Sequence, residues 1–175
     1  MSSKPKKAQE VAKPAPNPTA KPAAEADDVP AAPATIYVDA TGHVAGRLCS
    51  MVASQIIRGQ RVVVLNSEKA VLSGKRDTII AAWKERLELG SKVNPIYGPL
   101  HPRRPDNIVR RMVRGMVPKT KAKGILGMKR LRIYIGVPEK YSGVKMVKFD
   151  QALATRPLPM YTTLAELSHN IGWNG

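Results

Sequence analysis

Apolar positions in the first part of the chain change their spacing from one segment to the next. A short β-rich run at 36–38 predicts a strand that ends at Asp39. The apolar residues that follow recur at helical spacing and are Ala45, Leu48, Cys49, Val52 and Ile56. They predict a helix over 45–56 that terminates at Gly59. Four consecutive apolar residues within 61–66 predict a strand that is buried on both faces, as in the centre of a parallel sheet.

The next segments predict another strand and a second helix. Residues 70–72 have the composition of a short strand, and Ser73 can accept a hydrogen bond from the first turn of a helix behind it. That helix is predicted to run to about Leu89, with Gly90 closing it. Its predicted inward residues are Ile79, Ile80, Trp83 and Leu87. Strands that alternate with helices in this way are typical of right-handed βαβ units.

The C-terminal part adds one strand and one short helix. Residues 132–137 predict a strand that Pro138 ends. Thr163 and Glu166 have the spacing of a capping box, which predicts a helix that begins after Thr163 and stops before Gly172. The apolar residues of this helix are Leu164 and Leu167.

These elements predict one α/β domain over 36–175. We expect a small three-layer α/β/α arrangement with a mostly parallel sheet and a basic helix-loop insertion at about 95–131. Residues 1–35 differ in composition, with seven Pro, ten Ala and no aromatic residue. Such a segment cannot bury enough apolar surface to fold alone, so we expect a flexible tail.

The charge distribution adds a functional prediction. The chain carries a formal net charge of +16, and residues 101–132 contain eleven Lys or Arg but only one acid, Asp106. Such a concentration repels itself unless a polyanion neutralises it. No apolar run approaches the roughly 18 residues of a membrane-spanning helix, and the N-terminal segment lacks the apolar core of a signal peptide. The composition therefore favours nucleic acid as the partner and argues against a membrane.

The predicted helix after Asp106 separates apolar from basic residues. We expect Asp106 to be its N-cap. Ile108, Val109, Met112, Val113 and Met116 share one side, and Arg110, Arg111 and Arg114 share the opposite side. An ordinary amphipathic helix with a solvated basic face explains the apolar side fully. It does not explain why only one acid, Asp106 four positions before Arg110, stands three or four positions from any of these arginines. Three arginines on one rigid face suit bidentate contacts with phosphate.

Basic residues on either side of this helix extend the candidate RNA-binding surface. The full set is His101, Arg103, Arg104, Arg110, Arg111, Arg114, Lys119, Lys121, Lys123, Lys129, Arg130 and Arg132. Residues 119–124 alternate lysine with small residues and predict an irregular loop. Phe, Trp and Tyr make up only 5% of the chain, and Tyr97 is the one that closely precedes this set, which argues against base stacking. The expected target is folded RNA that is recognised by shape and phosphate.

Motifs for other chemistries fail on spacing. Gly42 and Gly46 lack the G-x-G spacing of a dinucleotide site, and Gly74-Lys75 lacks the other residues of a phosphate-binding loop. The histidines, His43, His101 and His169, are too scattered to predict a metal site. Cys49 is the only cysteine, which suits a reducing compartment such as the cytoplasm. We therefore expect no cofactor, no metal and no catalysis.

Two alternatives to a structural RNA-binding protein remain at this point. One is a nucleotide-dependent enzyme that uses the carboxyl edge of the sheet, where α/β proteins commonly bind ligands. The missing phosphate loop argues against it. The other is a free regulator that binds mRNA or DNA, and the same basic surface would serve it equally well.

A series of short motifs in a fixed order resembles a known family. The motifs are Asp39–Leu48, Val62–Glu68, Ser73–Lys75, Asn94-Pro95, Gly98-Pro99, His101, Arg103, Arg110, Val113–Met116, Pro118 and His169–Trp173. Together they resemble the universal large-subunit ribosomal protein thirteen family. Residues 94–101 favour its archaeal and eukaryotic form over the bacterial one. The end at Gly175, without the helical extension typical of eukaryotic members, points to the archaeal form.

The resemblance implies an α/β domain that binds large-subunit rRNA and contributes to subunit assembly and translation. It also implies neighbouring large-subunit proteins as partners, a place in the cytoplasm and no homo-oligomer. Two features depart from the usual family pattern. Cys49 replaces a common alanine, which is a conservative change, and residues 1–35 have no counterpart in the family core.

Overall fold

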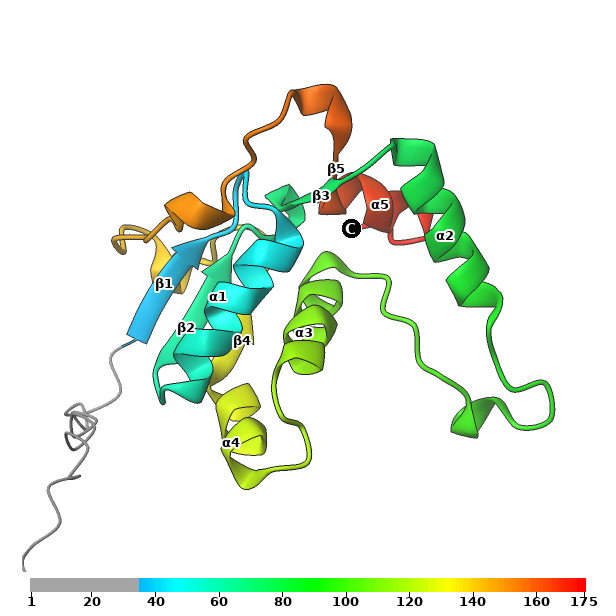
Figure 1. Cartoon of the computed structure of the whole chain (residues 1–175), viewed down its shortest axis with the longest axis horizontal. Helices are drawn as coiled ribbons and strands as arrows, with labels where there is room; N and C mark the ends of the chain where they lie inside the picture. Colours follow the sequence, from blue (N-terminus) through cyan, green and yellow to red (C-terminus); the bar gives the residue numbers. More distant parts are fainter. Residues whose placement is uncertain (1–34) are drawn as a thin grey trace, which may run out of the picture. The chain divides into compact units, whose positions relative to one another are not determined.

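The computed structural model describes residues 35–175, and the predicted tail lies outside them apart from Thr35. The strands in this part of the chain are β1 (Thr35–Asp39), β2 (Arg61–Leu65), β3 (Val71–Ser73), β4 (Leu131–Ile133) and β5 (Tyr161–Thr163). The α-helices are α1 (Ala45–Ile57), α2 (Arg76–Glu88), α3 (Pro105–Met116), α4 (Ala122–Arg130) and α5 (Leu164–Asn170) (Figure 1). The predicted α/β class is confirmed.

The main sheet is parallel and has the order β1-β2-β4. As the sequence predicts, β2 is central, and residues 62–65 are buried. β4 is shorter than the predicted strand at 132–137. The Tyr134 N–H still donates to the Val64 carbonyl at 2.9 Å, but Gly136 then adopts a φ of +65° and its N–H turns to the Glu68 carboxylate at 3.0 Å. The chain therefore leaves the sheet before Pro138.

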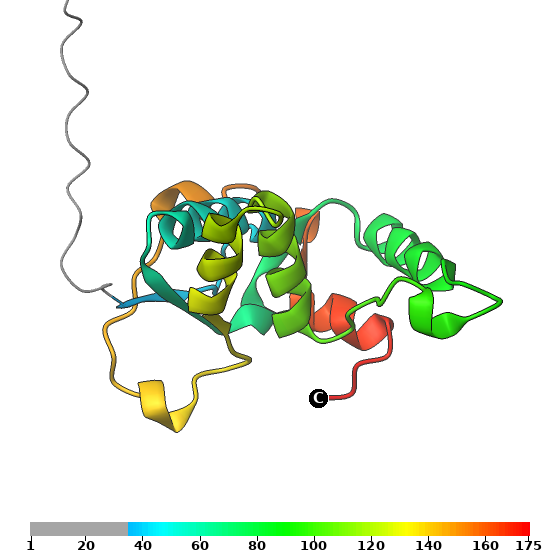
Figure 2. The same ribbon diagram turned by 90° about the horizontal axis from the view of Figure 1, so that it is seen from below.

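Helix α1 forms the centre of the core. Its residues Leu48, Cys49, Val52 and Ile56 are at most 1% exposed, and Gly59 follows with a φ of +103°, both as predicted. Helices α1, α3 and α4 lie on the same side of the sheet, whereas the segment around the 3-10 helix η3 (Glu139–Tyr141) lies on the other (Figure 2). A Cβ at Gly127 of α4 would stand 3.5 Å from the Ile56 carbonyl oxygen, so the glycine lets α4 approach the backbone of α1 closely.

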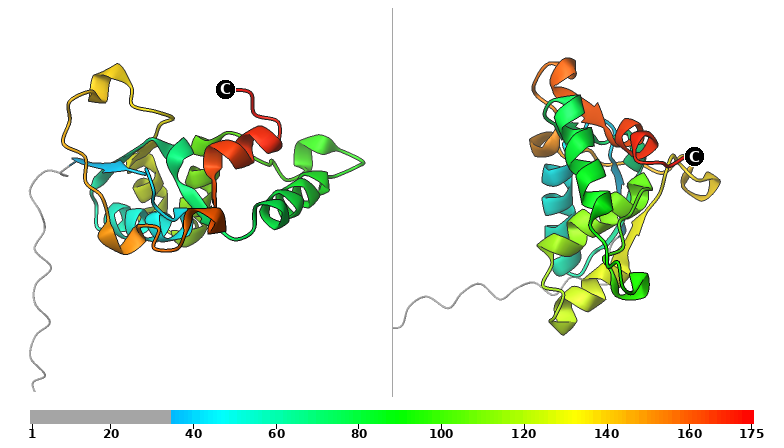
Figure 3. Two further views of the ribbon diagram at one scale, coloured as in Figure 1. Left: turned by 90° about the horizontal axis from the view of Figure 1, so that it is seen from above. Right: turned by 90° about the vertical axis from the view of Figure 1, so that its right-hand side faces the viewer.

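Two predictions about α2 are wrong. Ser73 is the last residue of β3 and caps nothing; Gly74 turns with a φ of +138°, and α2 begins at Arg76 after Lys75. At the other end the helix stops at Glu88 and Leu89 is extended, so Gly90 does not close it. The four apolar residues predicted to point inward are only half-buried, because α2 stands beside the core instead of on it (Figures 1 and 3).

Of the other predicted helix starts, strands and loops, some are confirmed and some are wrong. The predicted helix start after Thr163 is confirmed, because the Thr163 hydroxyl accepts a hydrogen bond from the Glu166 N–H at 3.2 Å, while the Glu166 carboxylate pairs with Arg76 at 2.6 Å. Asp106 is not an N-cap: α3 begins one residue earlier, at Pro105, and Asp106 lies in its first turn. The predicted strand at 70–72 exists, but it pairs antiparallel with β5 in a separate two-stranded sheet. The segment predicted as an irregular loop at 119–124 contains the start of α4.

Candidate nucleic-acid interface

Helix α3 presents the arginine face that the sequence predicts. Ile108, Val109 and Val113 are at most 1% exposed and attach the helix to the core. The opposite residues, Arg110, Arg111 and Arg114, are exposed. The apolar side is buried only in part, since Met112 is half-buried and Met116 is 45% exposed. The helix can therefore present its guanidinium groups to a ligand without disturbing the residues that hold it.

Four of the predicted residues line one hollow of about 370 Å³, here called the α3 hollow. Its lining residues are Leu100, His101, Pro102, Asn107, Arg110, Arg111, Arg114 and Met128. No acid is among them. Two of the four also make intramolecular bonds: Arg111 donates to the Leu100 carbonyl, and the His101 Nε2 lies 2.8 Å from the Leu89 carbonyl oxygen. Both therefore help to hold the connection from α2 to α3, which leaves Arg110 and Arg114 as the residues free to contact a ligand.

The arginine pair before α3 does not join this hollow. Arg104 pairs with Asp106, with 3.3 Å between the Arg104 Nε and the Asp106 Oδ1. The Arg103 guanidinium lies close to Gly172, where an added Cβ would stand 3.1 Å from its Nη1. Neither arginine is buried, but each lies beside a different part of the chain. The structure therefore places this pair apart from the α3 hollow, although the sequence groups both sets in one candidate surface.

The lysines after α3 lie at the turn into α4. Lys119, Lys121 and Lys123 are all exposed, and Lys121 is the residue that precedes the helix. A Cβ on Gly124 would collide with the carbonyl group of Pro118, so only glycine allows this tight turn. The lysines are thus displayed by a defined turn and the first turn of a helix.

The remaining predicted residues, Lys129, Arg130 and Arg132, line a second hollow of about 630 Å³, here called the tyrosine hollow. Sequence reasoning missed its other polar and aromatic residues, which are Thr35, Tyr37, Arg61, Lys140 and Tyr141. No acid lines it. Parallel register brings Arg61 beside the start of β1, because Thr35 pairs with Arg61. Strand pairing could have identified this cluster, but the register is not visible in a single sequence.

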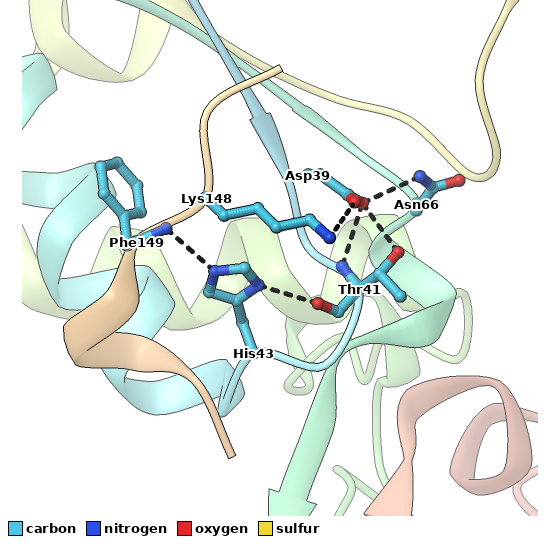
Figure 4. A network of polar contacts seen from close by, with 6 residues as sticks. All are labelled: Asp39, Thr41, His43, Asn66, Lys148 and Phe149. Atoms are coloured by element: carbon cyan, nitrogen blue, oxygen red, sulfur yellow. Dashed lines mark hydrogen bonds and ion pairs between the residues drawn. The ribbon is translucent and has the colours of Figure 1, made fainter. Parts of the chain in front are cut away.

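The carboxyl edge of the sheet is occupied by an internal polar network (Figure 4). The Asp39 carboxylate accepts hydrogen bonds from the Thr41 N–H at 3.1 Å, the Thr41 hydroxyl at 2.7 Å and the Asn66 side-chain amide at 2.9 Å. The Lys148 ammonium lies 3.7 Å from its other oxygen. Burial opposes ionisation of Asp39, but the bonds from Asn66 and Thr41 and the charge of Lys148 outweigh it and hold the pKa below its ordinary value.

His43 connects this edge to the segment before the 3-10 helix at Asp150–Ala152. The side chain is fully buried, its Nδ1 lies 3.0 Å from the Thr41 carbonyl oxygen, and its Nε2 accepts from the Phe149 N–H at 3.0 Å. These partners require a neutral ring that carries its proton on Nδ1. The groups at this edge are therefore used within the fold, which argues against the nucleotide-enzyme alternative.

Other chemistry has little support in the described part of the chain. Burial raises the pKa of the Cys49 thiol to about 12, so the thiol stays protonated and unreactive at neutral pH. Within residues 35–175, no three side chains of His, Cys, Asp or Glu gather as metal ligands. None of the helices in that range is both long enough and apolar enough to span a bilayer.

The fold and the distribution of charge define a small, strongly basic α/β protein. Residues 34–140 match the family model described as Ribosomal protein L13. Similar curated proteins carry the name large ribosomal subunit protein uL13. The one from Archaeoglobus fulgidus is 40% identical over 79% of this chain and 88% of its own length. The one from Methanocaldococcus jannaschii is 40% identical over 77% of this chain and 96% of its own length.

The chain therefore belongs to the ribosomal protein L13 family, and the resemblance inferred from the sequence motifs is confirmed. The relatives from Archaeoglobus, Methanocaldococcus and Saccharolobus solfataricus are archaeal, in agreement with the predicted form. Membership in this family makes the chain a structural constituent of the ribosome and not an enzyme.

Proposed function

We propose that this protein binds large-subunit rRNA mainly through phosphate contacts, that it supports assembly of the large subunit in the cytoplasm, and that it acts as a single copy. The observation that carries the proposal is the α3 hollow. Arg110 and Arg114 are exposed there, and within residues 35–175 neither forms an ion pair with an acid. Guanidinium groups held on a rigid helix are suited to bidentate contact with phosphate oxygens.

Three further groups of basic residues support the same proposal. Lys119, Lys121 and Lys123 extend the charge from α3 towards α4. Lys129, Arg130 and Arg132 continue it to the tyrosine hollow. Arg103 and Arg104 add charge just before the start of α3, although the charge of Arg104 is partly neutralised by Asp106. Phosphate contacts spread over such a surface position an RNA without recognising its sequence.

The test replaces Arg110 and Arg114 by Gln together. Hydrogen bonds to charged groups contribute about 1.5–3 kcal/mol each, so affinity for large-subunit rRNA should fall by about tenfold or more per arginine. The lysine double variant should fall between the wild type and the glutamine variant, because it keeps the charge but loses the planar fork. Arg111 is left in place because it also holds the Leu100 carbonyl.

A matched control removes the same charge from the neighbouring helix. Arg47 and Arg58 are exposed, one on α1 and one just after it, and their replacement by Gln should change rRNA affinity much less. Filter binding at one fixed salt concentration measures both variants, and gradient sedimentation of lysate measures their incorporation into large subunits. Equal losses in the two variants would mean that only overall charge matters, and the role of the α3 hollow would be refuted.

Neighbouring large-subunit proteins are the second class of partner in this proposal. Residues 89–100 contain one charged residue, Lys92, and five exposed apolar ones. These are Leu89, Val93, Ile96, Tyr97 and Leu100, between 62% and 98% exposed. An apolar segment of this size favours contact with protein over contact with phosphate. Replacing Ile96 and Tyr97 by Ser should reduce incorporation into subunits and leave affinity for naked rRNA unchanged; reduced affinity for naked rRNA would contradict this part.

A further inference from the structure

The tyrosine hollow combines two chemistries that the α3 hollow does not. Five cationic side chains line it, from Arg61, Lys129, Arg130, Arg132 and Lys140. Two aromatic rings, those of Tyr37 and Tyr141, share the lining. The volume of about 630 Å³ lies within the range of pockets that hold small organic ligands. It therefore has room for a planar group as well as charge for an anion.

The position of the hollow follows from the strand register. Tyr37, Val63 and Arg132 form one row across β1, β2 and β4, and their neighbours Ile36, Val62 and Leu131 form the next row. Successive side chains on a strand point to opposite faces. Since Val62 and Leu131 belong to the core beneath α1, the row that contains Tyr37 and Arg132 faces the other side of the sheet. The segment that carries η3 lies on that side and brings Tyr141 beside Tyr37 (Figure 2).

The aromatic rings are close together but are not stacked on one another. The centroids of Tyr37 and Tyr141 are 5.5 Å apart with an interplanar angle of 52°, and those of Tyr134 and Tyr141 are 5.4 Å apart at 49°. Tyr141 is half-buried. The ammonium of Lys140 lies 5.9 Å from its ring centroid, so the aromatic and cationic groups occupy the same small region. An aromatic ring surrounded by cations suits a base that is attached to phosphate.

We propose that the tyrosine hollow binds one unpaired RNA nucleotide, with the base stacked on Tyr141 and the adjacent phosphates on Arg132 and its cationic neighbours. This inference rests on the proposed function, because it assumes an RNA partner, but it concerns a different hollow from the α3 hollow and a different mode of recognition. The α3 hollow has cationic groups suited to phosphate, and no Tyr, Trp or Phe side chain lines it. The tyrosine hollow adds recognition of a base that has left the helical stack.

The test uses the full chain and two fluorescent RNA hexanucleotides, hexa-adenylate and the same backbone without bases. Stacking on an aromatic side chain contributes about 1–3 kcal/mol per base, so Tyr141→Ala should weaken binding of hexa-adenylate by about ten- to a hundredfold. Tyr141→Phe keeps the ring and should bind as the wild type does. The abasic RNA should bind the wild type weakly and should not distinguish the three proteins. Thermal melts followed by circular dichroism verify that each variant is folded.

Two further arms separate this inference from the proposed function. Tyr141→Ala should keep nearly full affinity for large-subunit rRNA, where the α3 hollow contributes, and the Arg110/Arg114 glutamine variant should still bind hexa-adenylate. Adenosine monophosphate should compete far more weakly than hexa-adenylate, since it lacks the flanking phosphates. Unchanged binding by Tyr141→Ala, equal binding of the abasic RNA, or competition by the mononucleotide as strong as by the hexamer would each overturn the inference.

Discussion

Helices α1 and α3 pack against each other and both bury an apolar face, but their outer faces differ. The exposed positions of α1 are mostly small or neutral, with Gly46, Ser50 and Ser54 among them. The exposed positions of α3 include Arg110, Arg111 and Arg114. Because α1 packs on the core without such a row of arginines, the core does not require the arginines of α3. The charge on α3 is best explained by a ligand.

The largest effect on stability should come from substitutions on the buried faces of α1 and α3. Leu48 of α1 and Val113 of α3 are fully buried. Leu48→Ala should reduce the free energy of unfolding by about 2–5 kcal/mol, and Val113→Ala by less because fewer carbon atoms are removed from the core. Urea unfolding measures both. A stability of Val113→Ala equal to that of the wild type would show that α3 is not part of the cooperative core.

A smaller effect is expected at the carboxyl edge of the sheet. Asp39→Asn removes the charge that Asn66, Thr41 and Lys148 stabilise, so it should lower stability at pH 7 by about 1–2 kcal/mol. The folded pKa of Asp39 is depressed. Its contribution is therefore complete above the unfolded pKa near 3.9 and is lost as pH falls through the lower folded value.

The difference between wild type and Asp39→Asn should accordingly shrink as the pH falls below about 4 and through the lower folded pKa of Asp39. Urea unfolding at pH 7 and at successive lower pH values measures it. A difference that stays constant over this range would mean that the ionised carboxylate does not stabilise the fold.

The outer face of α3 should have almost no effect on stability. Replacing Arg110 and Arg114 by Gln should change the free energy of unfolding by less than about 0.5 kcal/mol, as is usual for exposed positions. The melting temperature could rise slightly, because the change relieves self-repulsion. Differential scanning calorimetry compares this variant with the α1 control at Arg47 and Arg58. A strongly destabilised variant would show that the arginines serve the fold after all.

The smallest effect is expected from deletion of residues 1–34. Their composition offers no core, and the buried apolar residues of the described part extend from Val38 to Ile171 and form a core of their own. We therefore propose that they are dispensable for the fold, and the melting temperature followed by circular dichroism should stay the same. Loss of the cooperative transition after the deletion would contradict this.

Local patterns predicted α1, β2 and α5 because their signals lie within a few residues. The apolar spacing of Leu48 and Ile56 and the capping box at Thr163 need no knowledge of distant parts of the chain. Helix α4 was missed because its helix-forming signal is weak. Gly124 and Gly127 disfavour a helix locally, and α4 is held by close packing of these glycines on Pro118 and Ile56.

In the candidate site, too, the features that depend on local sequence could be predicted and those that depend on distant contacts could not. The arginine face of α3 could be predicted because it depends on one helical period. The grouping of Tyr37 with Tyr141 could not, since it depends on strand register and on a segment that returns from far along the chain. Likewise, composition does not reveal that His101 and Arg111 bond to the carbonyl groups of Leu89 and Leu100 and so help to hold the fold.

The central claim is that phosphate contacts dominate the binding of rRNA, and its most direct test is the salt dependence of affinity. If about five to eight of the eleven basic residues in 101–132 contact phosphate, the slope of log K against log salt should be near −4 to −7. The Arg110/Arg114 glutamine variant should have a slope shallower by about 2, and the α1 control should keep the wild-type slope. An affinity for large-subunit rRNA that does not change with salt would contradict the account.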